Sequence, residues 1–274
     1  MKKLQGRVAI VSGGGRGIGR ALCLKLASEG ASIVVNDLDI EPAEAVVKEI
    51  TEAGGDAIIC AGSVTKDGFA ESFVKTALDH FGDLHIIVNN AGYTFDSMIH
   101  KMSDLQMDAM YDIHVKAPFR ILRAASHHFR AVAKDEAASG NIIVRKVVNV
   151  SSAVGLRGNI GQANYAAMKA GVVGLTKALS KEWGRLNVNV NSVAFGYIET
   201  RLTAPTDVKD IVSVDGNEVP LGIPPALVQG MKMLIPMGRG GTTEEAANAI
   251  YLFCTPESNY ISGEVVTVGG GLSL

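Results

Sequence analysis

Short apolar runs alternate with longer stretches of helical pattern along most of this chain. Continuous β-branched runs predict buried parallel strands, and they cover Val8–Val11, Ser32–Val35, Ala57–Cys60, His85–Val88, Val147–Val150, Val188–Val193 and Val265–Val268. The stretches between them predict helices over Gly17–Ser28, Pro42–Ala53, Gly68–Phe81, Ser103–Val132, Gln162–Trp183 and Glu244–Phe253. This alternation predicts an α/β fold, with one doubly wound parallel sheet and helices on both faces.

Two segments interrupt the alternation. The polar stretch Lys134–Asn141 is predicted to be a surface loop. The segment 203–236 is rich in proline but contains an apolar piece, Ala226–Leu234, which favours a substrate lid over disorder. There is no internal repeat and no linker, so we expect a single domain over residues 1–274 with a lid insertion at about 203–236.

Composition narrows the possible functions. The chain has 274 residues, of which 47% are hydrophobic and 20% charged, so it can bury a large core. The net charge is −2 and no basic run is present, which argues against nucleic acid as a partner. No stretch approaches the roughly 20 apolar residues of a membrane span, and the run Val8–Val11 is too short for a signal peptide. The three cysteines are scattered, so we expect neither a metal nor disulfides, and a cytoplasmic location.

A glycine-rich loop follows the first predicted strand. Gly13, Gly17 and Gly19 lie in the stretch GGGRGIG, which leads into a helix. Glycines let a backbone approach a pyrophosphate closely, and the helix N-terminus offers free N–H groups. A glycine-rich turn without a ligand is the alternative, but the position after a strand and before a helix favours a dinucleotide.

The second predicted strand is followed by Asp37, about 20 residues after the glycine loop. A carboxylate there accepts hydrogen bonds from the adenosine ribose and repels a 2′-phosphate. Arg16 favours NADP instead, since a basic residue in the loop is able to bind that phosphate. We weigh Asp37 more heavily, and therefore expect NAD as the cofactor in preference to NADP.

The stretch YAAMK places Tyr165 and Lys169 four residues apart on a predicted helix. Residues at this spacing share one helix face, with Cβ atoms roughly 5–6 Å apart. Taken alone, the pair is more often found on a solvated helix face. Its meaning depends on the motifs around it.

With these motifs together, the chain resembles the short-chain dehydrogenase/reductase family. The motifs are GGGRGIG at 13–19, NNAG at 89–92, Ser152, YAAMK at 165–169 and GYIET at 196–200, in the family's order over almost the whole chain. The resemblance implies a single Rossmann-type domain with a seven-stranded sheet, NAD(P)-linked chemistry on secondary alcohols and ketones, and usually a homotetramer.

The resemblance also implies roles for individual residues. Tyr165 would be the general acid/base, Lys169 would lower its pKa and bind the nicotinamide ribose, and Ser152, rather than its neighbour Ser151, would hold the substrate oxygen. A cation about 4 Å away lowers a phenol's pKa by up to roughly 3 units. The residues expected to contact the cofactor are Gly13, Arg16, Gly17, Ile18, Gly19, Asp37, Ser63, Val64, Asn90, Ala91, Gly92, Tyr165, Lys169, Gly196, Ile198 and Thr200.

Three positions depart from the family pattern. His114 stands where the family has a catalytic asparagine, and it either preserves the proton relay to Lys169, adds a titration near neutral pH, or is a satisfied core histidine. Ser63 replaces an aspartate that bonds adenine. Phe195 replaces a proline before Gly196 and is expected to alter the wall beside the nicotinamide.

The sequence motifs DIHVK at 112–116 and GQANY at 161–165 are similar to those of 3-oxoacyl carrier-protein reductases and 3-hydroxyacyl-CoA dehydrogenases. We therefore expect an NAD-linked enzyme that interconverts a secondary alcohol and a ketone, with a 3-hydroxyacyl or 3-oxoacyl thioester as candidate substrate. A cyclic or steroid-like alcohol is the alternative substrate. A non-catalytic NAD-binding regulator is the alternative from another class, because fold does not determine function.

Overall fold

The computed structural model describes residues 2–205, 210–214 and 217–272. Its centre is a seven-stranded parallel sheet with the strand order β3-β2-β1-β4-β5-β6-β9, which confirms the predicted fold class. The strands are β1 Val8–Val11, β2 Ser32–Val35, β3 Asp56–Ile59, β4 Ile86–Asn89, β5 Arg145–Ser152, β6 Val188–Phe195 and β9 Val265–Val268. Val11 at the end of β1 is in register with Val35 and Val88, so three chain segments leave the sheet at one edge.

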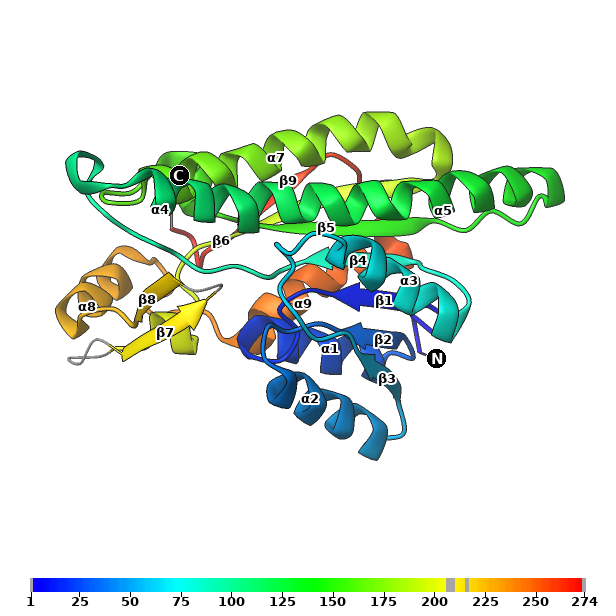
Figure 1. Ribbon diagram of the computed structural model, residues 1–274, viewed down its shortest axis with the longest axis horizontal. Helices are drawn as coiled ribbons and strands as arrows, with labels where there is room; N and C mark the ends of the chain where they lie inside the picture. Colours follow the sequence, from blue (N-terminus) through cyan, green and yellow to red (C-terminus); the bar gives the residue numbers. More distant parts are fainter. Residues whose placement is uncertain (1, 206–209, 215–216, 273–274) are drawn as a thin grey trace.

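Two helical layers cover the sheet (Figure 1). One layer contains α1 Gly17–Ser28, α2 Ile40–Glu52 and α9 Thr243–Cys254, and the other contains α3 Phe69–Phe81, α5 Ala117–Ser139 and α7 Ala163–Trp183. Each layer encloses its own apolar core against one face of the sheet. Buried parallel strands contribute apolar side chains to both faces, which explains why they read as continuous apolar runs.

The predicted helix over 103–132 is interrupted. It consists of α4 Asp104–Tyr111, a π-helical turn over Asp112–Lys116, and α5. Ser103 caps α4 with Gln106 in a capping box. The π turn contains His114, and such turns are often found at functional sites.

The predicted surface loop over Lys134–Asn141 is wrong for most of its length, because α5 continues to Ser139. The reason is tertiary. The Glu136 carboxylate forms an ion pair with the fully buried Arg145 at 2.8 Å and accepts the N–H of Ile143 at 3.2 Å. A sequence window cannot show that this last turn has a buried partner.

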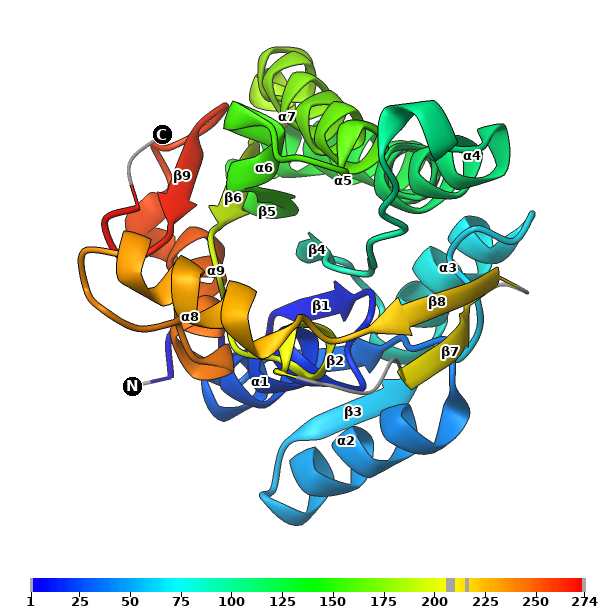
Figure 2. The same ribbon diagram turned by 90° about the vertical axis from the view of Figure 1, so that its left-hand side faces the viewer.

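The predicted lid has secondary structure of its own. It contains the antiparallel hairpin of β7 Asp210–Val214 and β8 Asn217–Leu221, followed by α8 Pro225–Leu234, while residues 206–209 and 215–216 lie outside the described residues. Val228 and Ile235 pack against Tyr197, just after β6. Figure 2 shows the hairpin, α8 and the short helix α6 Ala153–Arg157 at the same end of the molecule.

Candidate active site

The glycine loop has the geometry of a phosphate cradle. Gly13 and Gly17 have φ angles of +63° and +52°, which favour glycine. A Cβ on Gly19 would lie 1.9 Å from the Gly13 carbonyl oxygen, whereas a Cβ on Gly17 would meet nothing closer than Thr200 Cγ2 at 3.9 Å. The loop is therefore closed on the protein side and open towards the segment that contains Thr200. This geometry fits a bound dinucleotide, and Ile18 follows in the first turn of α1.

The NNAG segment supports this loop from β4. Asn90 donates from Nδ2 to the carbonyl oxygens of Ser12 and Gly13, both at 3.0 Å. In return, Ser12 Oγ accepts the N–H groups of Asn90 and Ala91 at 3.0 and 3.1 Å. Gly92 packs against the His114 ring, because a Cβ there would lie 2.5 Å from its Cε1. Asn90 and Ala91 thus support the glycine loop, while Gly92 faces His114.

Asp37 lies beside the loop as expected. The Gly15 N–H donates to Asp37 Oδ2 at 3.0 Å, and Arg16 Nη1 lies 3.4 Å from Asp37 Oδ1. The same Nη1 donates to Asp39 Oδ2 at 2.8 Å. The carboxylate of Asp37 and the guanidinium of Arg16 are therefore neighbours at the end of β2.

Two further groups of predicted cofactor residues lie at the same sheet edge. Ser63 follows β3 and shares a hydrogen bond with Thr65 at 2.8 Å, while Val64 is buried in the core. After β6, Gly196 donates its N–H to Val268, and a Cβ on it would lie 2.9 Å from Gly269. Phe195, expected to shape the wall beside the nicotinamide, instead packs into the core with α1 and α9.

The segment after Gly196 turns towards the glycine loop. Ile198 is buried and pairs with Gly241, and Thr200 caps a 3-10 helix, η4 Arg201–Thr203, together with Thr203. Tyr197, Glu199, Thr200, Arg201, Ala204, Pro205 and Lys232 line a pocket of about 460 Å³ between this segment and α8.

Ser152 and Tyr165 meet at the carboxyl end of β5. Ser152 is the last residue of β5, Tyr165 lies in the first turn of α7, and their side chains are hydrogen-bonded. Burial raises the pKa of Tyr165 to about 12, the Ser152 hydrogen bond lowers it, and the negative charge of Asp96 raises it. This direction is opposite to the lowered pKa expected from Lys169.

Ser151, the alternative to Ser152, is engaged elsewhere. Its Oγ donates to the Lys169 carbonyl oxygen at 2.8 Å, and its side chain is buried. Ser152 Oγ accepts the Val154 N–H at 3.2 Å and donates to the Phe195 carbonyl at 3.4 Å. The structure thus brings Ser152, and not Ser151, to the phenol.

Lys169 lies beside the Tyr165 ring, with Nζ 5.6 Å from the ring centroid. Only 4% of the residue is exposed, and Nζ donates to the Val150 carbonyl oxygen at 2.7 Å. Burial lowers the pKa of Lys169 to about 7. The pKa of the phenol is therefore dominated by burial and not by the charge of Lys169.

His114 is buried and also contacts Tyr165. The rings meet edge to face, with centroids 5.1 Å apart. His114 Nε2 donates to the Tyr93 carbonyl oxygen at 2.8 Å, so Nδ1 carries the lone pair, and within the described residues Nδ1 has no hydrogen-bond partner. Burial and the charge of Lys169 lower the pKa of His114 well below its usual value. A titration of this residue near neutral pH is therefore not supported.

Three polar residues of the site were not predicted from the sequence. Asn164 is fully buried and donates to the carbonyls of Phe95 and Gln106 at 3.0 and 3.1 Å. Gln162 donates to Asp96 Oδ2 at 2.8 Å. These contacts hold the loop after β4 against the start of α7, beside Tyr165. The polar residues directly before Tyr165 in GQANY were the only signal for them.

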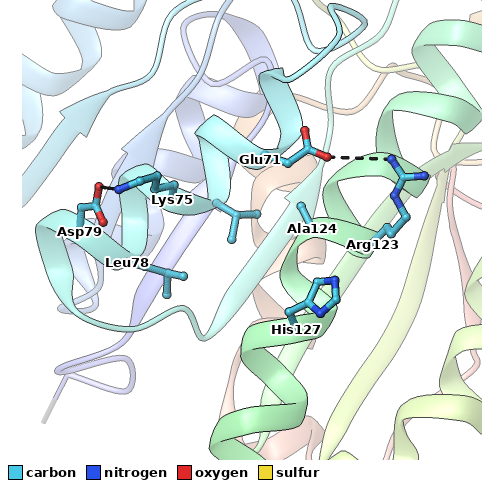
Figure 3. A pocket seen from close by; sticks show the side chains of 8 residues that line it. Glu71, Lys75, Leu78, Asp79, Arg123, Ala124 and His127 are labelled. Atoms are coloured by element: carbon cyan, nitrogen blue, oxygen red, sulfur yellow. Dashed lines mark hydrogen bonds and ion pairs between the residues drawn. The ribbon is translucent and has the colours of Figure 1, made fainter.

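A second hollow, of about 380 Å³, lies between α3 and α5 (Figure 3). Its charged lining is partly paired, with Glu71 opposite Arg123 at 3.9 Å and Lys75 bonded to Asp79. None of the predicted site residues lines it.

The described residues contain neither a cluster of metal-ligating side chains nor a helix suited to a membrane. In residues 2–205, 210–214 and 217–272, no group of three His, Cys, Asp or Glu residues is placed to hold a metal ion. In the same ranges, no helix combines the length and apolar character needed to cross a membrane.

Comparisons with known proteins agree with this geometry. Residues 7–210 match the family profile described as short chain dehydrogenase. The chain is 36% identical to a 3-oxoacyl-[acyl-carrier-protein] reductase of Aquifex aeolicus, with 98% of each chain covered. It is 34% identical to the Thermotoga maritima protein of the same name, covering 98% of this chain and 99% of the relative. A double mutant of a Serratia marcescens short-chain dehydrogenase/reductase superposes with a TM-score of 0.83 at 29% identity, covering 99% of this chain and all of the other.

Proposed function

The chain belongs to the short-chain dehydrogenase family of oxidoreductases, which use a nicotinamide cofactor, and we propose that it interconverts 3-oxoacyl and 3-hydroxyacyl thioesters with NAD(H). The observation that carries the proposal is the convergence of Ser152, Tyr165 and Lys169 beside an open glycine cradle. The thioester substrate is suggested by the names of relatives about 35% identical over nearly the full length.

Ser152 and Tyr165 would hold the substrate carbonyl. Their hydroxyl groups lie within hydrogen-bond distance of each other, so one acceptor oxygen placed between them would receive a hydrogen bond from each, in place of the bonds that they donate now. Because its pKa is about 12, the phenol is protonated at neutral pH and is ready to give its proton to a carbonyl. This is the protonation state that reduction of a carbonyl requires of the general acid.

Lys169 would stabilise the negative charge left on Tyr165. Its ammonium uses one donor on the Val150 carbonyl, and an ammonium has three. The remaining donors would hold the nicotinamide ribose. When bound, the nicotinamide supplies the hydride to the carbonyl carbon or accepts it from the alcohol.

Asp37 supports NAD over NADP. Its carboxylate lies at the end of β2 beside the cradle, where it would accept the ribose hydroxyls and repel a 2′-phosphate. The segment 203–236 would cover the substrate. Its residues Ala204, Pro205 and Lys232 help to line the 460 Å³ pocket, which has the size of a small-molecule site.

The homotetramer implied by the family resemblance stays a prediction. Large apolar side chains on α9 and near β9, such as Leu252 and Tyr260, are exposed and would suit subunit contacts. Sedimentation equilibrium would measure the subunit number.

The proposed function is tested by initial rates with NADH and NADPH on a 3-oxoacyl thioester and on a cyclic ketone. We expect NADH-linked reduction of the thioester, and a loss of about 10²–10⁴-fold in kcat for Tyr165→Phe. Tyr111→Phe, which removes an exposed phenol on α4, is the matched control and should keep full activity. Unchanged turnover in Tyr165→Phe would refute the mechanism. Activity on the cyclic ketone alone would refute the thioester assignment.

A further inference from the structure

Arg16 lies where a basic residue would meet the 2′-phosphate of NADP. It precedes the first turn of α1 in the glycine loop, and its Nη1 lies 3.4 Å from Asp37 Oδ1 at the ribose end of the site. In dinucleotide-binding folds, an arginine near the acidic residue of β2 is the group that accommodates this phosphate. By position alone, Arg16 would therefore be a phosphate receptor.

The guanidinium is held by a different carboxylate. Arg16 Nη1 donates to Asp39 Oδ2 at 2.8 Å, which is shorter than its contact with Asp37. Both side chains are partly exposed, at 41% for Arg16 and 51% for Asp39, so the pair lies at the rim of the site and not in the core. A phosphate arriving there would compete with Asp39 for the same donors.

Asp39 is unusual for its position. It occupies the N-cap of α2, where an aspartate ordinarily accepts a backbone N–H of the first turn. Here the Asp39 side chain makes no capping hydrogen bond. Its carboxylate is turned to Arg16 instead, so this contact replaces a local interaction that the residue type favours.

Asp37, by contrast, is held in place by the backbone. Its Oδ2 accepts the Gly15 N–H at 3.0 Å and its Oδ1 accepts the Asp39 N–H at 3.3 Å. A Cβ on Gly15 would lie 2.7 Å from Asp37 Oδ2, so the carboxylate is packed on the glycine loop. Asp37 would therefore bind the ribose from a fixed position. The orientation of Arg16 is set mainly by its shorter contact with Asp39.

We propose that Asp39 is a second determinant of cofactor specificity, which acts by holding the Arg16 guanidinium and withholding it from the 2′-phosphate of NADP. The proposal rests on the assignment of the glycine loop and Asp37 to a nicotinamide dinucleotide. Two carboxylates against one guanidinium leave a net negative charge at this corner, which opposes a phosphate. Removing the Asp39 charge would free the Arg16 guanidinium to bind the 2′-phosphate and would also reduce the negative charge that repels this phosphate.

The test compares the dissociation constants of NADH and NADPH, measured by calorimetry on the full chain. For Asp39→Asn we expect NADPH to bind on the order of tenfold more tightly, which is about 1.4 kcal/mol, with NADH changed less than twofold. Asparagine is as good an N-cap as aspartate, so α2 should be preserved. Adding Arg16→Gln to this variant should abolish the gain.

Glu49→Gln is the matched control. Glu49 pairs with Arg20, one turn further along α1, so this change removes one negative charge from the same pair of helices without touching Arg16. We expect no selective gain of NADPH affinity. An equal gain in Glu49→Gln would show an effect of net charge alone and would overturn the proposal.

The remaining outcomes separate this inference from the proposed function. If Asp39→Asn leaves NADPH affinity unchanged, or if the gain survives Arg16→Gln, the role of Asp39 is refuted whatever the wild-type preference. The wild-type ratio of the NADH and NADPH constants tests the NAD assignment by itself. A wild-type chain that prefers NADPH would refute that assignment, while the change caused by Asp39→Asn would still decide the inference.

Discussion

Ionisable side chains are buried near both ends of strands β4 and β5, but only those at the amino end have charged partners. At the amino end, the fully buried Arg145 lies 2.8 Å from Glu136 and 3.4 Å from Asp83. At the carboxyl end, Lys169 is nearly as deeply buried, yet its Nζ has a carbonyl oxygen as hydrogen-bond partner and, among the described residues, no carboxylate within ion-pair distance.

The pKa values follow this difference. Burial alone would raise the pKa of Asp83, but the hydrogen bond from His128 and the charges of His85 and Arg145 hold it well below its usual range. Burial lowers the pKa of Lys169 to about 7 without a compensating partner. The buried charge of Arg145 is therefore paired with carboxylates, whereas the buried Lys169 is not.

Removal of a charge partner at the amino end should have the largest effect on stability. Asp83→Asn leaves Arg145 buried with one carboxylate fewer, and we expect a loss of about 3 kcal/mol in the free energy of unfolding. Denaturant titration at pH 7 measures it. The control is Asp79→Asn, which breaks an exposed pair with Lys75 and should cost less than about 1 kcal/mol. A loss of similar size in both variants would remove the contrast between paired and surface charges.

The amino end should also make stability depend on pH. Burial lowers the pKa of His85 to about 4, despite the opposing charge of Asp83. The folded pKa lies below the unfolded value near 6.5, so the unfolded state binds more protons between these values. Stability is then full above about pH 6.5 and falls by up to roughly 3 kcal/mol as the pH drops towards 4.

Protonation would also break the hydrogen bond in which His85 Nδ1 accepts the Val8 N–H at 3.1 Å. Unfolding measured between pH 4.5 and 7 should show this slope in the wild type and a flatter one in His85→Gln. His80→Gln, at an exposed position of α3, should keep the wild-type slope. Parallel slopes in all three proteins would contradict the assignment to His85.

At the carboxyl end, the unpaired charge should lower stability. Since the folded pKa of Lys169 is below the unfolded value of about 10.5, its charge costs stability at neutral pH. Lys169→Met should therefore raise the free energy of unfolding by about 2 kcal/mol while it lowers kcat by at least about 10²-fold. Lys177→Met, on the exposed face of α7, is the control for both readouts. A destabilised Lys169→Met variant would show that the ammonium contributes to folding after all.

The smallest effect is expected at His114. Because its pKa is well below the usual value, the ring is neutral, and it acts through the hydrogen bond to the Tyr93 carbonyl. In His114→Asn, the pH profile of kcat/KM should keep every ionisation of the wild type, and stability should change by less than about 1 kcal/mol. An ionisation near neutral pH that disappears in the variant would show that His114 titrates in a proton relay.

The sheet was predictable because its strands are buried on both faces. β1, β2 and β9 have the predicted bounds, and the other four differ only at their ends. The end of α5 was not predictable, because Lys134–Asn141 is polar and its helical turn depends on Arg145, a residue from the next strand. The π turn at Asp112–Lys116 was also missed, since local apolar spacing does not distinguish it from an α-helix.

The sequence by itself determined the α/β class, the glycine cradle, the acidic residue after β2 and the spacing that joins Tyr165 to Lys169, because each depends on local residue order. Only the tertiary structure decided the electrostatic state of these groups. Burial at the carboxyl edge raises the pKa of Tyr165 and lowers that of Lys169, and Asp39 turns from its own helix to Arg16. The physical reason is that desolvation and charge pairing depend on which elements pack together, and the spacing of residues along the chain does not contain that information.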